Sequence, residues 1–232
     1  MAISKVLDEI NIFMGRVYHG NWKNRWADTP FMTEFNASGK SESILGHMWA
    51  LKELWFQIKQ VCPELNKVVN SELLYEKIMN HDLGETNDEG DISMTRQLRG
   101  EGQNKKLTER EQLLSLTDSL SEKTQSIILN NFDEFEEAPE NISNIETLVA
   151  KYLDTLQGDQ FALIFGNNLP DNSELIDKII KFRFVKYSQR LIEVLDEKGY
   201  IDASDEVVII ANHHLGQIRS AGIRIMVENF TH

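Results

Sequence analysis

Apolar residues recur along most of the chain at intervals of three and four, a spacing that places them on one face of an α-helix. In the first half this pattern predicts a helix over 43–61, which Pro63 ends. A second helix contains Ile78 and stops near Gly84, and helical spacing resumes over 108–132. The pattern therefore predicts an all-α protein.

The second half of the chain shows the same spacing in longer runs. It predicts a helix over 145–165, a further helix that is capped at 171–172 and ends at Gly199, and a last helix from about Ser204. The apolar run over 207–210 fits a short strand equally well. We find no internal repeat and no second compositional regime.

Polar stretches separate these helices. Residues 97–106 are polar and contain glycine, which predicts a mobile connection or lid. The acidic stretch over 133–140 predicts a solvated loop between helices. The residues before 43 are expected to form a helix and an extended arm.

Net charge excludes one broad class of partner. The chain has 232 residues, with 24 lysines and arginines against 37 aspartates and glutamates, so its formal net charge is −13. Proteins that bind DNA or RNA normally carry a basic face, because neutralisation of phosphates supplies most of the affinity. A nucleic-acid polymer is therefore not an expected partner.

Cysteine usage and hydropathy indicate the compartment. Cys62 is the only cysteine, so it cannot form an intrachain disulfide, and we expect a buried structural thiol in a reducing compartment. No apolar run reaches the roughly 18 residues that a membrane helix needs, and the first residues lack a signal-peptide core. The sequence predicts a cytoplasmic protein with no membrane partner.

Candidate metal ligands gather at the end of the second predicted helix. His81 and Asp82 are adjacent there, and Glu85 follows four and three residues later, which returns it to the same face. Imidazole and carboxylate ligands together favour Mn, Fe, Co, Ni or Zn over an all-oxygen calcium site. This arrangement suits a metal ion and an acid or base group.

Two further candidates lie on other predicted helices. His47 is in the first turn of its helix, and Asp154 stands among apolar residues, where an unpaired carboxylate is costly to bury. Metal coordination would remove that cost. A hydrogen-bonded packing role for His47, and a pairing of Asp154 with Lys151 or an arginine, remain alternatives.

These candidates occur within three short strings. The strings are Ser43-Ile-Leu-Gly-His47, His81-Asp82-Leu-Gly-Glu85 followed by Gly90-Asp91, and Ala150-Lys151-Tyr-Leu-Asp154-Thr-Leu-Gln157. Their order resembles that of the HD-domain metal-dependent phosphohydrolases, over about Arg25 to Gln157. Within that superfamily the chain is most similar to the 5′-deoxynucleotidases, in which an arginine–tryptophan pair like Arg25-Trp26 contacts phosphate and sugar.

The resemblance implies a fold and a cofactor. The expected fold is a single HD-domain-like helical bundle, with an N-terminal helix and arm over 1–42, a metal-binding core over 43–165 and additional C-terminal helices over 166–232. The expected cofactor is one divalent transition metal ion, with Mn, Co, Fe, Ni or Zn preferred over Mg. A homodimer is also expected by resemblance.

The resemblance also implies roles for individual residues. The expected metal ligands are His47, His81, Asp82 and Asp154; the expected catalytic residues are Glu85 and Asp91; the expected substrate-binding residues are Arg25, Trp26 and Lys151. The implied activity is release of phosphate from deoxyribonucleoside 5′-monophosphates. A dNTP triphosphohydrolase, a hydrolase of ppGpp-type nucleotides, and a non-catalytic nucleotide-binding helical module remain alternatives.

Several other residues have structural interpretations. His213 and His214 are adjacent, so their side chains point apart on a helix, and a surface or packing role is expected. Trp49 and Trp55 are expected to fill the core. Trp26 fits a half-buried anchor for the N-terminal arm as well as it fits a sugar contact.

Overall fold

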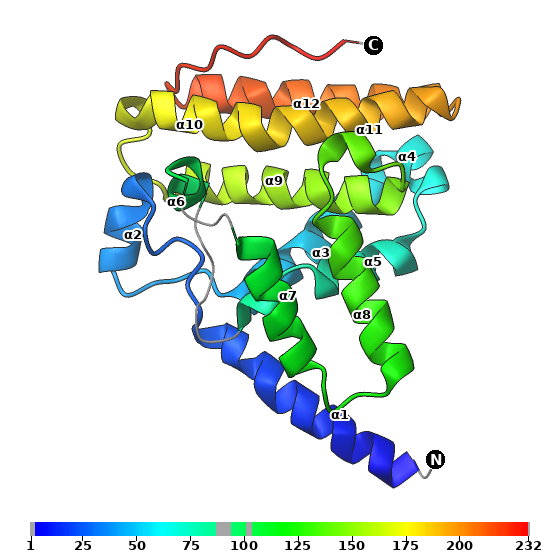
Figure 1. Cartoon of the computed structure of the whole chain (residues 1–232). Coiled ribbons are helices and arrows are strands. Elements are labelled where there is room, and N and C mark those ends of the chain that lie inside the picture. The colour runs from blue at the N-terminus through cyan, green and yellow to red at the C-terminus, as the bar shows by residue number, and fades with distance from the viewer. Residues whose placement is uncertain (1–2, 87–93, 101–103, 232) are drawn as a thin grey trace.

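The computed structural model describes residues 3–86, 94–100 and 104–231 of the chain (Figure 1). Within these ranges the regular structure is helical throughout, and the only β-type pairing is an isolated bridge between Asn24 and Ser43. The prediction of an all-α protein is confirmed, and the ambiguous run over 207–210 is helical.

The helices follow one another with short connections. The first half contains α1 (Ile3–Val17), α2 (Thr33–Ala37), α3 (Ile44–Val61), α4 (Pro63–Val68), α5 (Ser71–Asn80), α6 (Met94–Leu98) and α7 (Lys105–Leu116). The second half contains α8 (Glu122–Phe135), α9 (Ile145–Phe165), α10 (Ser173–Ile180), α11 (Lys186–Glu197) and α12 (Ile201–Ser220). Short 3-10 turns lie at Tyr18–Trp22, Pro30–Met32, Leu83–Thr86, Pro139–Asn141 and Pro170–Asn172, and a π-helical turn, Lys181–Val185, joins α10 to α11.

Side-chain caps fix the start of the helices that carry the candidate ligands. Ser43 accepts a hydrogen bond from the Gly46 amide at the start of α3, and Asn144 does the same for Thr147 at the start of α9. Such caps satisfy amide groups that have no partner within the helix. Asn172 occupies the cap position of α10, but its side chain makes no capping bond.

Helix α9 lies at the centre of the molecule. It contacts α3, α5, α8 and α11, while α12 covers α11 and reaches α4 (Figure 1). The larger hydrophobic cluster includes side chains from all of these helices, with Trp55, Tyr152 and Phe184 among its largest fully buried members. A smaller cluster around Phe132 joins α3 to α7 and α8, so α3 contributes to both.

The structure corrects several boundaries. The last helix begins at Ile201 rather than near Ser204, which is a buried residue inside α12. Residues 97–106, predicted to be a connection or lid, include the end of α6 and the start of α7, and residues 101–103 lie outside the described part. The expected N-terminal helix is present as α1 (Ile3–Val17), and the residues between it and α3 include short helical turns in place of an extended arm. Gly199 adopts a φ of +79° directly after α11, which agrees with its predicted role as a helix end.

One core prediction is wrong. Trp55 is fully buried, whereas Trp49 is 67% exposed on the outer face of α3. The two residues are six positions apart, which corresponds to about 600° of helical rotation and therefore to different faces.

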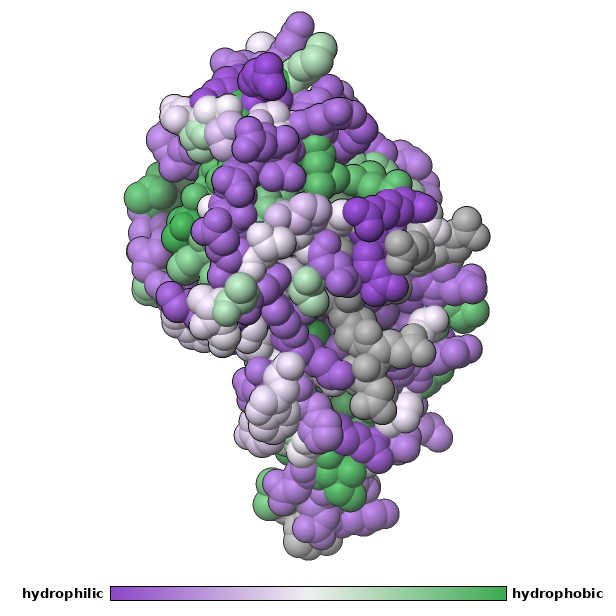
Figure 2. All heavy atoms as spheres, turned by 90° about the vertical axis from the view of Figure 1, so that its left-hand side faces the viewer, coloured by the Kyte–Doolittle hydropathy of each residue, from purple (hydrophilic) through white to green (hydrophobic). Residues whose placement is uncertain are grey.

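Figure 2 shows one face of the molecule, which is mostly hydrophilic, with hydrophobic residues gathered in the upper body and in a smaller group on the protruding lower part. Among the described helices, none has both the length and the hydropathy required to cross a membrane.

Candidate metal centre

Three buried side chains converge from three different helices. His47 lies in the first turn of α3, His81 is the residue that ends α5, and Asp154 lies in the middle of α9. One nitrogen of each histidine and one oxygen of the aspartate all lie within 4.8 Å of one another. Residues that are far apart in the sequence therefore present potential metal ligands to a single point.

A chain of hydrogen bonds holds the ring of His47. Its Nδ1 lies 2.7 Å from Gln157 Oε1, and Gln157 Nε2 donates to Glu42 Oε1 at 2.7 Å. Because Glu42 can only accept, this network fixes the orientation of the Gln157 amide and requires the proton of His47 to be on Nδ1. Trp26 Nε1 donates to the other oxygen of Glu42 at 2.7 Å, which anchors the network to the N-terminal segment. When neutral, His47 therefore presents Nε2 as a lone pair.

The ring of His81 is held in the same tautomer. Its Nδ1 lies 2.8 Å from the carbonyl oxygen of Ile78, which can only accept a hydrogen bond. The ring also packs against Phe135, with 4.6 Å between centroids. The neutral ring therefore also presents Nε2 as a lone pair. A hydrogen bond from the second ring nitrogen to a carbonyl or amide oxygen is typical of histidines that bind metal.

The converging atoms are hydrogen-bond acceptors. A cation placed between them would stabilise this arrangement. Asp154 Oδ1 lies 3.2 Å from His47 Nε2, and within the described part of the chain neither atom has a hydrogen-bond partner; the same holds for His81 Nε2. Asp82 Oδ2 lies 3.2 Å from His81 Nε2 and 3.6 Å from His47 Nε2. The donor set of two imidazoles and two carboxylates fits a divalent transition metal ion.

Two arginines balance the charge of the carboxylates. Arg25 forms ion pairs with Asp82 and with Asp154, the latter at 3.6 Å, and Arg183 forms an ion pair with the other oxygen of Asp154. Burial alone would raise the pKa of Asp154, but Arg183, His47 and Arg25 hold it well below its usual range. For Asp82 burial is likewise outweighed, mainly by His81 and Arg25, so its pKa is also lowered. Both carboxylates are therefore ionised at neutral pH.

His81 has a perturbed pKa as well. Burial lowers it, but the adjacent Asp82 raises it by more, so the net pKa lies above the usual value. A metal ligand must be deprotonated, so metal binding at this residue competes with its protonation. Metal affinity at the centre is therefore expected to weaken as the pH falls.

The structure describes one of the two predicted catalytic residues. Glu85 is buried in the 3-10 turn after α5, where its Oε1 accepts a hydrogen bond from Lys105 Nζ at 2.7 Å. Its other oxygen is buried and has no hydrogen-bond partner among the described residues. Lys105 also pairs with Glu109 at 2.8 Å, which links the turn to α7. Asp91 lies outside the described residues.

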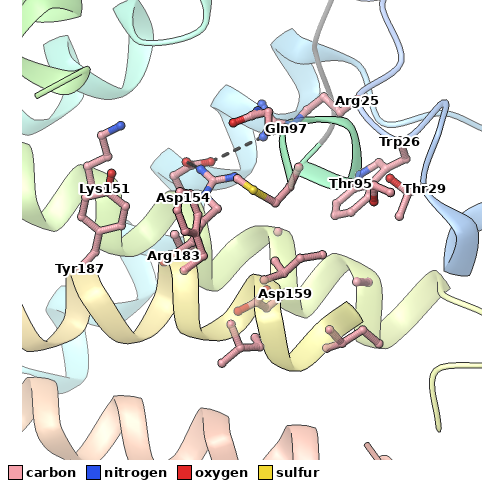
Figure 3. A pocket seen from close by; sticks show the side chains of 18 of the residues that line it. Arg25, Trp26, Thr29, Thr95, Gln97, Lys151, Asp154, Asp159, Arg183 and Tyr187 are labelled. Carbon is pink, nitrogen blue, oxygen red and sulfur yellow. Dashed lines mark hydrogen bonds and ion pairs between the residues drawn. The ribbon is translucent and has the colours of Figure 1, made fainter. Parts of the chain in front are cut away.

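A cavity of about 250 Å³ adjoins the candidate ligands. Its polar part includes Arg25, Asp82, Glu85, Lys105, Glu136, Lys151, Asp154, Asp159, Arg183 and Lys186. Its apolar part includes Phe31, Phe135, Ala162, Leu163, Leu169, Ile179, Ile180 and Ile223. Figure 3 shows Asp154 and Arg183 next to each other near the centre of the view, with Trp26 and Thr29 to one side of this pair and Lys151 and Tyr187 to the other.

The predicted substrate-binding residues line the same cavity. Trp26 is half-buried and stacks on Phe161, with 5.6 Å between ring centroids and an interplanar angle of 7°. Together with its bond to Glu42, this contact fits the anchor interpretation of Trp26. Lys151 is buried beside Glu136 at 3.4 Å, and its Nζ lies 3.8 Å from the centroid of the Phe135 ring.

The alternative partner of Asp154 is an arginine, Arg183, which the sequence analysis did not single out. It lies in the π-helical turn between α10 and α11, and such turns are frequent at functional sites. Gln157 and Glu42 were also missed as residues that hold His47. For Gln157 a signal was present, because it lies three positions after Asp154 and hence on the same helical face.

The adjacent histidines of α12 have separate environments. His213 is exposed, and His214 is buried against Phe184 with 4.8 Å between ring centroids. These placements agree with the surface and packing roles expected from sequence. Neither residue belongs to the group around Asp154.

Comparison with known proteins identifies the family. A model described as the HD domain matches residues 33–195, which is more than half of the chain and includes His47, His81 and Asp154. Searches of curated proteins and of solved structures gave no match. With its buried His, His and Asp side chains at one point of a helical fold, the chain belongs to the HD-domain family, whose members are typically metal-dependent phosphohydrolases.

Proposed function

We propose that the protein is a 5′-nucleotidase that releases phosphate from deoxyribonucleoside 5′-monophosphates. His47, His81, Asp82 and Asp154 would hold one divalent transition metal ion. When bound, such an ion activates water and stabilises charge on phosphoryl oxygens. The observation that carries the proposal is the convergence of the two Nε2 atoms and the Asp154 carboxylate beside a cavity that also contains arginine and lysine side chains.

Arg25 and Arg183 are the groups that would bind the phosphoryl group. Both pair with Asp154, and both line the cavity. A guanidinium has five N–H donors in a planar fork, so it can keep a carboxylate contact and still donate to a phosphate oxygen. The two arginines would therefore hold a phosphate close to the ligand set.

Glu85 is the group that would move a proton. One of its oxygens is occupied by Lys105, and the other is a buried acceptor without a hydrogen-bond partner in the described ranges. Glu85 lines the cavity, and in this proposal its second oxygen would accept a proton from an attacking water or return one to the leaving 5′-oxygen. Lys105 would fix the carboxylate in position for that transfer.

The charge balance of the cavity favours a monophosphate over a polyphosphate. Among the described residues that line it, five are cationic and five are acidic. A bound divalent ion therefore supplies the main excess of positive charge, which matches one phosphoryl group better than the larger negative charge of a triphosphate or of ppGpp.

The proposal is tested by metal reconstitution coupled to a substrate screen. Metal-free protein is loaded with Mn, Co, Zn or Mg and assayed for phosphate release from deoxyribonucleoside and ribonucleoside monophosphates, and for hydrolysis of dNTPs and ppGpp. We expect hydrolysis of the deoxyribonucleoside monophosphates. Hydrolysis of only dNTPs or ppGpp, or metal binding with no hydrolysis of any substrate, would refute the proposal, and the latter would favour the non-catalytic module.

Two variants test the assigned roles. Glu85→Gln should lower kcat by about 10²–10⁴-fold and retain the metal, because it removes proton transfer but no ligand. Asp154→Asn should lose the metal by elemental analysis. Glu122→Gln, at an exposed position at the start of α8, is the matched control and should change neither quantity.

A further inference from the structure

One face of α9 continues from the metal centre along the cavity. Asp154, Thr155, Gly158, Asp159 and Ala162 all line it. Residues four apart lie above one another on a helix, so Gly158 follows Asp154 by one turn and Ala162 follows by two. This face therefore extends from the reacting end of the cavity towards its apolar part.

Gly158 lowers the floor of the cavity. A Cβ at this position would meet no described atom within 4 Å, so the space above the backbone is open. A glycine within a helix is less favourable than alanine, so its position beside the cavity fits a requirement for open space there. The open space lets a flat group approach the helix backbone closely.

The carboxylate of Asp159 lies next to Gly158 in the chain and forms a contact with a histidine. Its side chain is 16% exposed, and its Oδ2 lies 3.3 Å from Nε2 of His214, which is buried in α12. The carboxylate can only accept, so Nε2 is the donor in this contact. Figure 3 shows Asp159 between α9 and the helix formed by α10 and α11, among the side chains that line the cavity.

Apolar side chains also line this cavity. They include Leu163 of the same helix, Ile179 and Ile223. An open backbone floor, an apolar lining and an acceptor beside them fit a flat, uncharged ring that has an N–H donor at its edge.

We propose that Gly158 and Asp159 form a subsite for the base of the nucleotide substrate, in which Asp159 accepts a hydrogen bond from a base N–H and His214 is a positioning residue for Asp159. The inference rests on the proposed function, because the base is part of the leaving group of the 5′-monophosphate. It adds the residues that distinguish a nucleotide from a sugar phosphate without a base.

The test compares two substrates that differ only by the base. 2′-Deoxyadenosine 5′-monophosphate contains the ring, and 2-deoxyribose 5-phosphate has the same sugar and phosphate without it. For the wild type we expect a higher kcat/KM for the nucleotide. Asp159→Asn should lower that kcat/KM by about 10-fold, mainly through KM, because the charged acceptor is replaced by a neutral amide oxygen that accepts a weaker hydrogen bond. It should leave the value for deoxyribose 5-phosphate unchanged.

Gly158 has a matched control within the same chain. Gly216 also lies in a helix, and a Cβ there would also meet no described atom within 4 Å, but it does not line the cavity. Gly158→Ala and Gly216→Ala should both fold at least as stably as the wild type. Only Gly158→Ala should raise KM for the nucleotide, and Gly158→Leu should raise it further.

The positioning role of His214 is tested by a pair of variants. His214→Leu should raise KM for the nucleotide as Asp159→Asn does, without an added effect in the double variant, and His214→Gln should restore part of the loss because it retains a donor. Equal kcat/KM for both substrates in the wild type, or equal effects of Asp159→Asn on both substrates, would overturn the subsite.

Failure of the proposed function is distinguishable from failure of the subsite. If the wild type releases no phosphate from either substrate, the phosphatase proposal fails, and calorimetric titration with deoxyadenosine then decides the subsite. Binding that Asp159→Asn weakens at least tenfold supports the subsite. Absence of binding to the wild type overturns it.

Discussion

Gln157 holds the ring of His47, one of the candidate metal ligands, through a hydrogen bond. Its Oε1 accepts the hydrogen bond of His47 Nδ1, and Gln157→Met removes this acceptor while keeping a side chain of similar length. His47 is fully buried, so its Nδ1–H is left without a partner, at a cost of about 1–3 kcal/mol to folding of the metal-free protein. Loss of such an outer partner also lowers metal affinity by about 10–100-fold, which corresponds to about 1.4–2.7 kcal/mol.

Both quantities can be measured directly. Metal affinity is obtained by competition with a chelating indicator, and the free energy of unfolding by urea titration in the presence of a chelator. Gln60→Met is the control, because Gln60 is exposed on α3 and its amide donates to the Phe56 carbonyl on the same helix. This control should leave both values unchanged.

Exchanging the side chains of Gln157 and Glu42 distinguishes an effect on the orientation of His47 from a simple loss of packing. Gln157→Glu keeps an acceptor for His47 but faces the carboxylate of Glu42, so it should weaken metal binding. Adding Glu42→Gln restores a donor between the two positions and leaves an oxygen for Trp26 Nε1, so the double variant should recover affinity. The reasoning is refuted if Gln157→Met binds metal within twofold of the wild type, or if the double variant is no better than Gln157→Glu.

Three further predictions follow from burial and pKa. Burial raises the pKa of Glu109 to about 9, so the stability that its neutral form contributes is fully present below about pH 4.5 and is lost as the pH rises towards 9. The free energy of unfolding in urea should therefore become higher for Glu109→Gln than for the wild type as the pH rises across that window. Parallel pH profiles of the two proteins would contradict this. Burial also raises the pKa of the Cys62 thiol to about 11, so an alkylating reagent at pH 8 should label the folded protein far more slowly than the unfolded one, and equal rates would count against it. Trp49→Lys should change the free energy of unfolding by no more than about 0.5 kcal/mol, whereas Trp55→Ala should cost about 3–5 kcal/mol, and a large loss for Trp49→Lys would show that its exposed position is wrong.

Helix positions could be predicted from the sequence where one face is buried along the whole helix. Helix α9 begins and ends where the sequence predicts. Asn144 caps its start, and Gly166, which follows its last residue, has an extended backbone conformation. Trp49 was misplaced because an aromatic residue at helical spacing does not reveal which face is covered. Ser204 resembles a helix start in the sequence because serine favours caps, whereas its buried position inside α12 is set by tertiary packing.

The ligands of the candidate site could be predicted, but the residues that hold them could not. His47, His81 and Asp154 stand out because polar residues in apolar helices require a partner. Arg183 did not stand out, because it lies beside the regularly spaced buried residues Ile180 and Phe184 rather than among them. Its ion pair with Asp154 depends on how α9 packs against the π-helical turn, which helical spacing within one segment does not show.

A single rigid helix sets the distance between the two ends of the candidate active site. Asp154 and Gly158 are four residues apart on α9, so the metal centre and the proposed base subsite are separated along the helix by roughly 6 Å. Because α9 is buried without a break from Thr147 to Gln157, the packing around it resists bending or shifting of the helix next to Asp154. Insertion of one residue after Thr155 would rotate Gly158 and Asp159 by about 100° away from the cavity while leaving Asp154 in place. Metal binding and base recognition therefore share one element but depend on different parts of its sequence, which is why the subsite can be altered while metal binding is preserved.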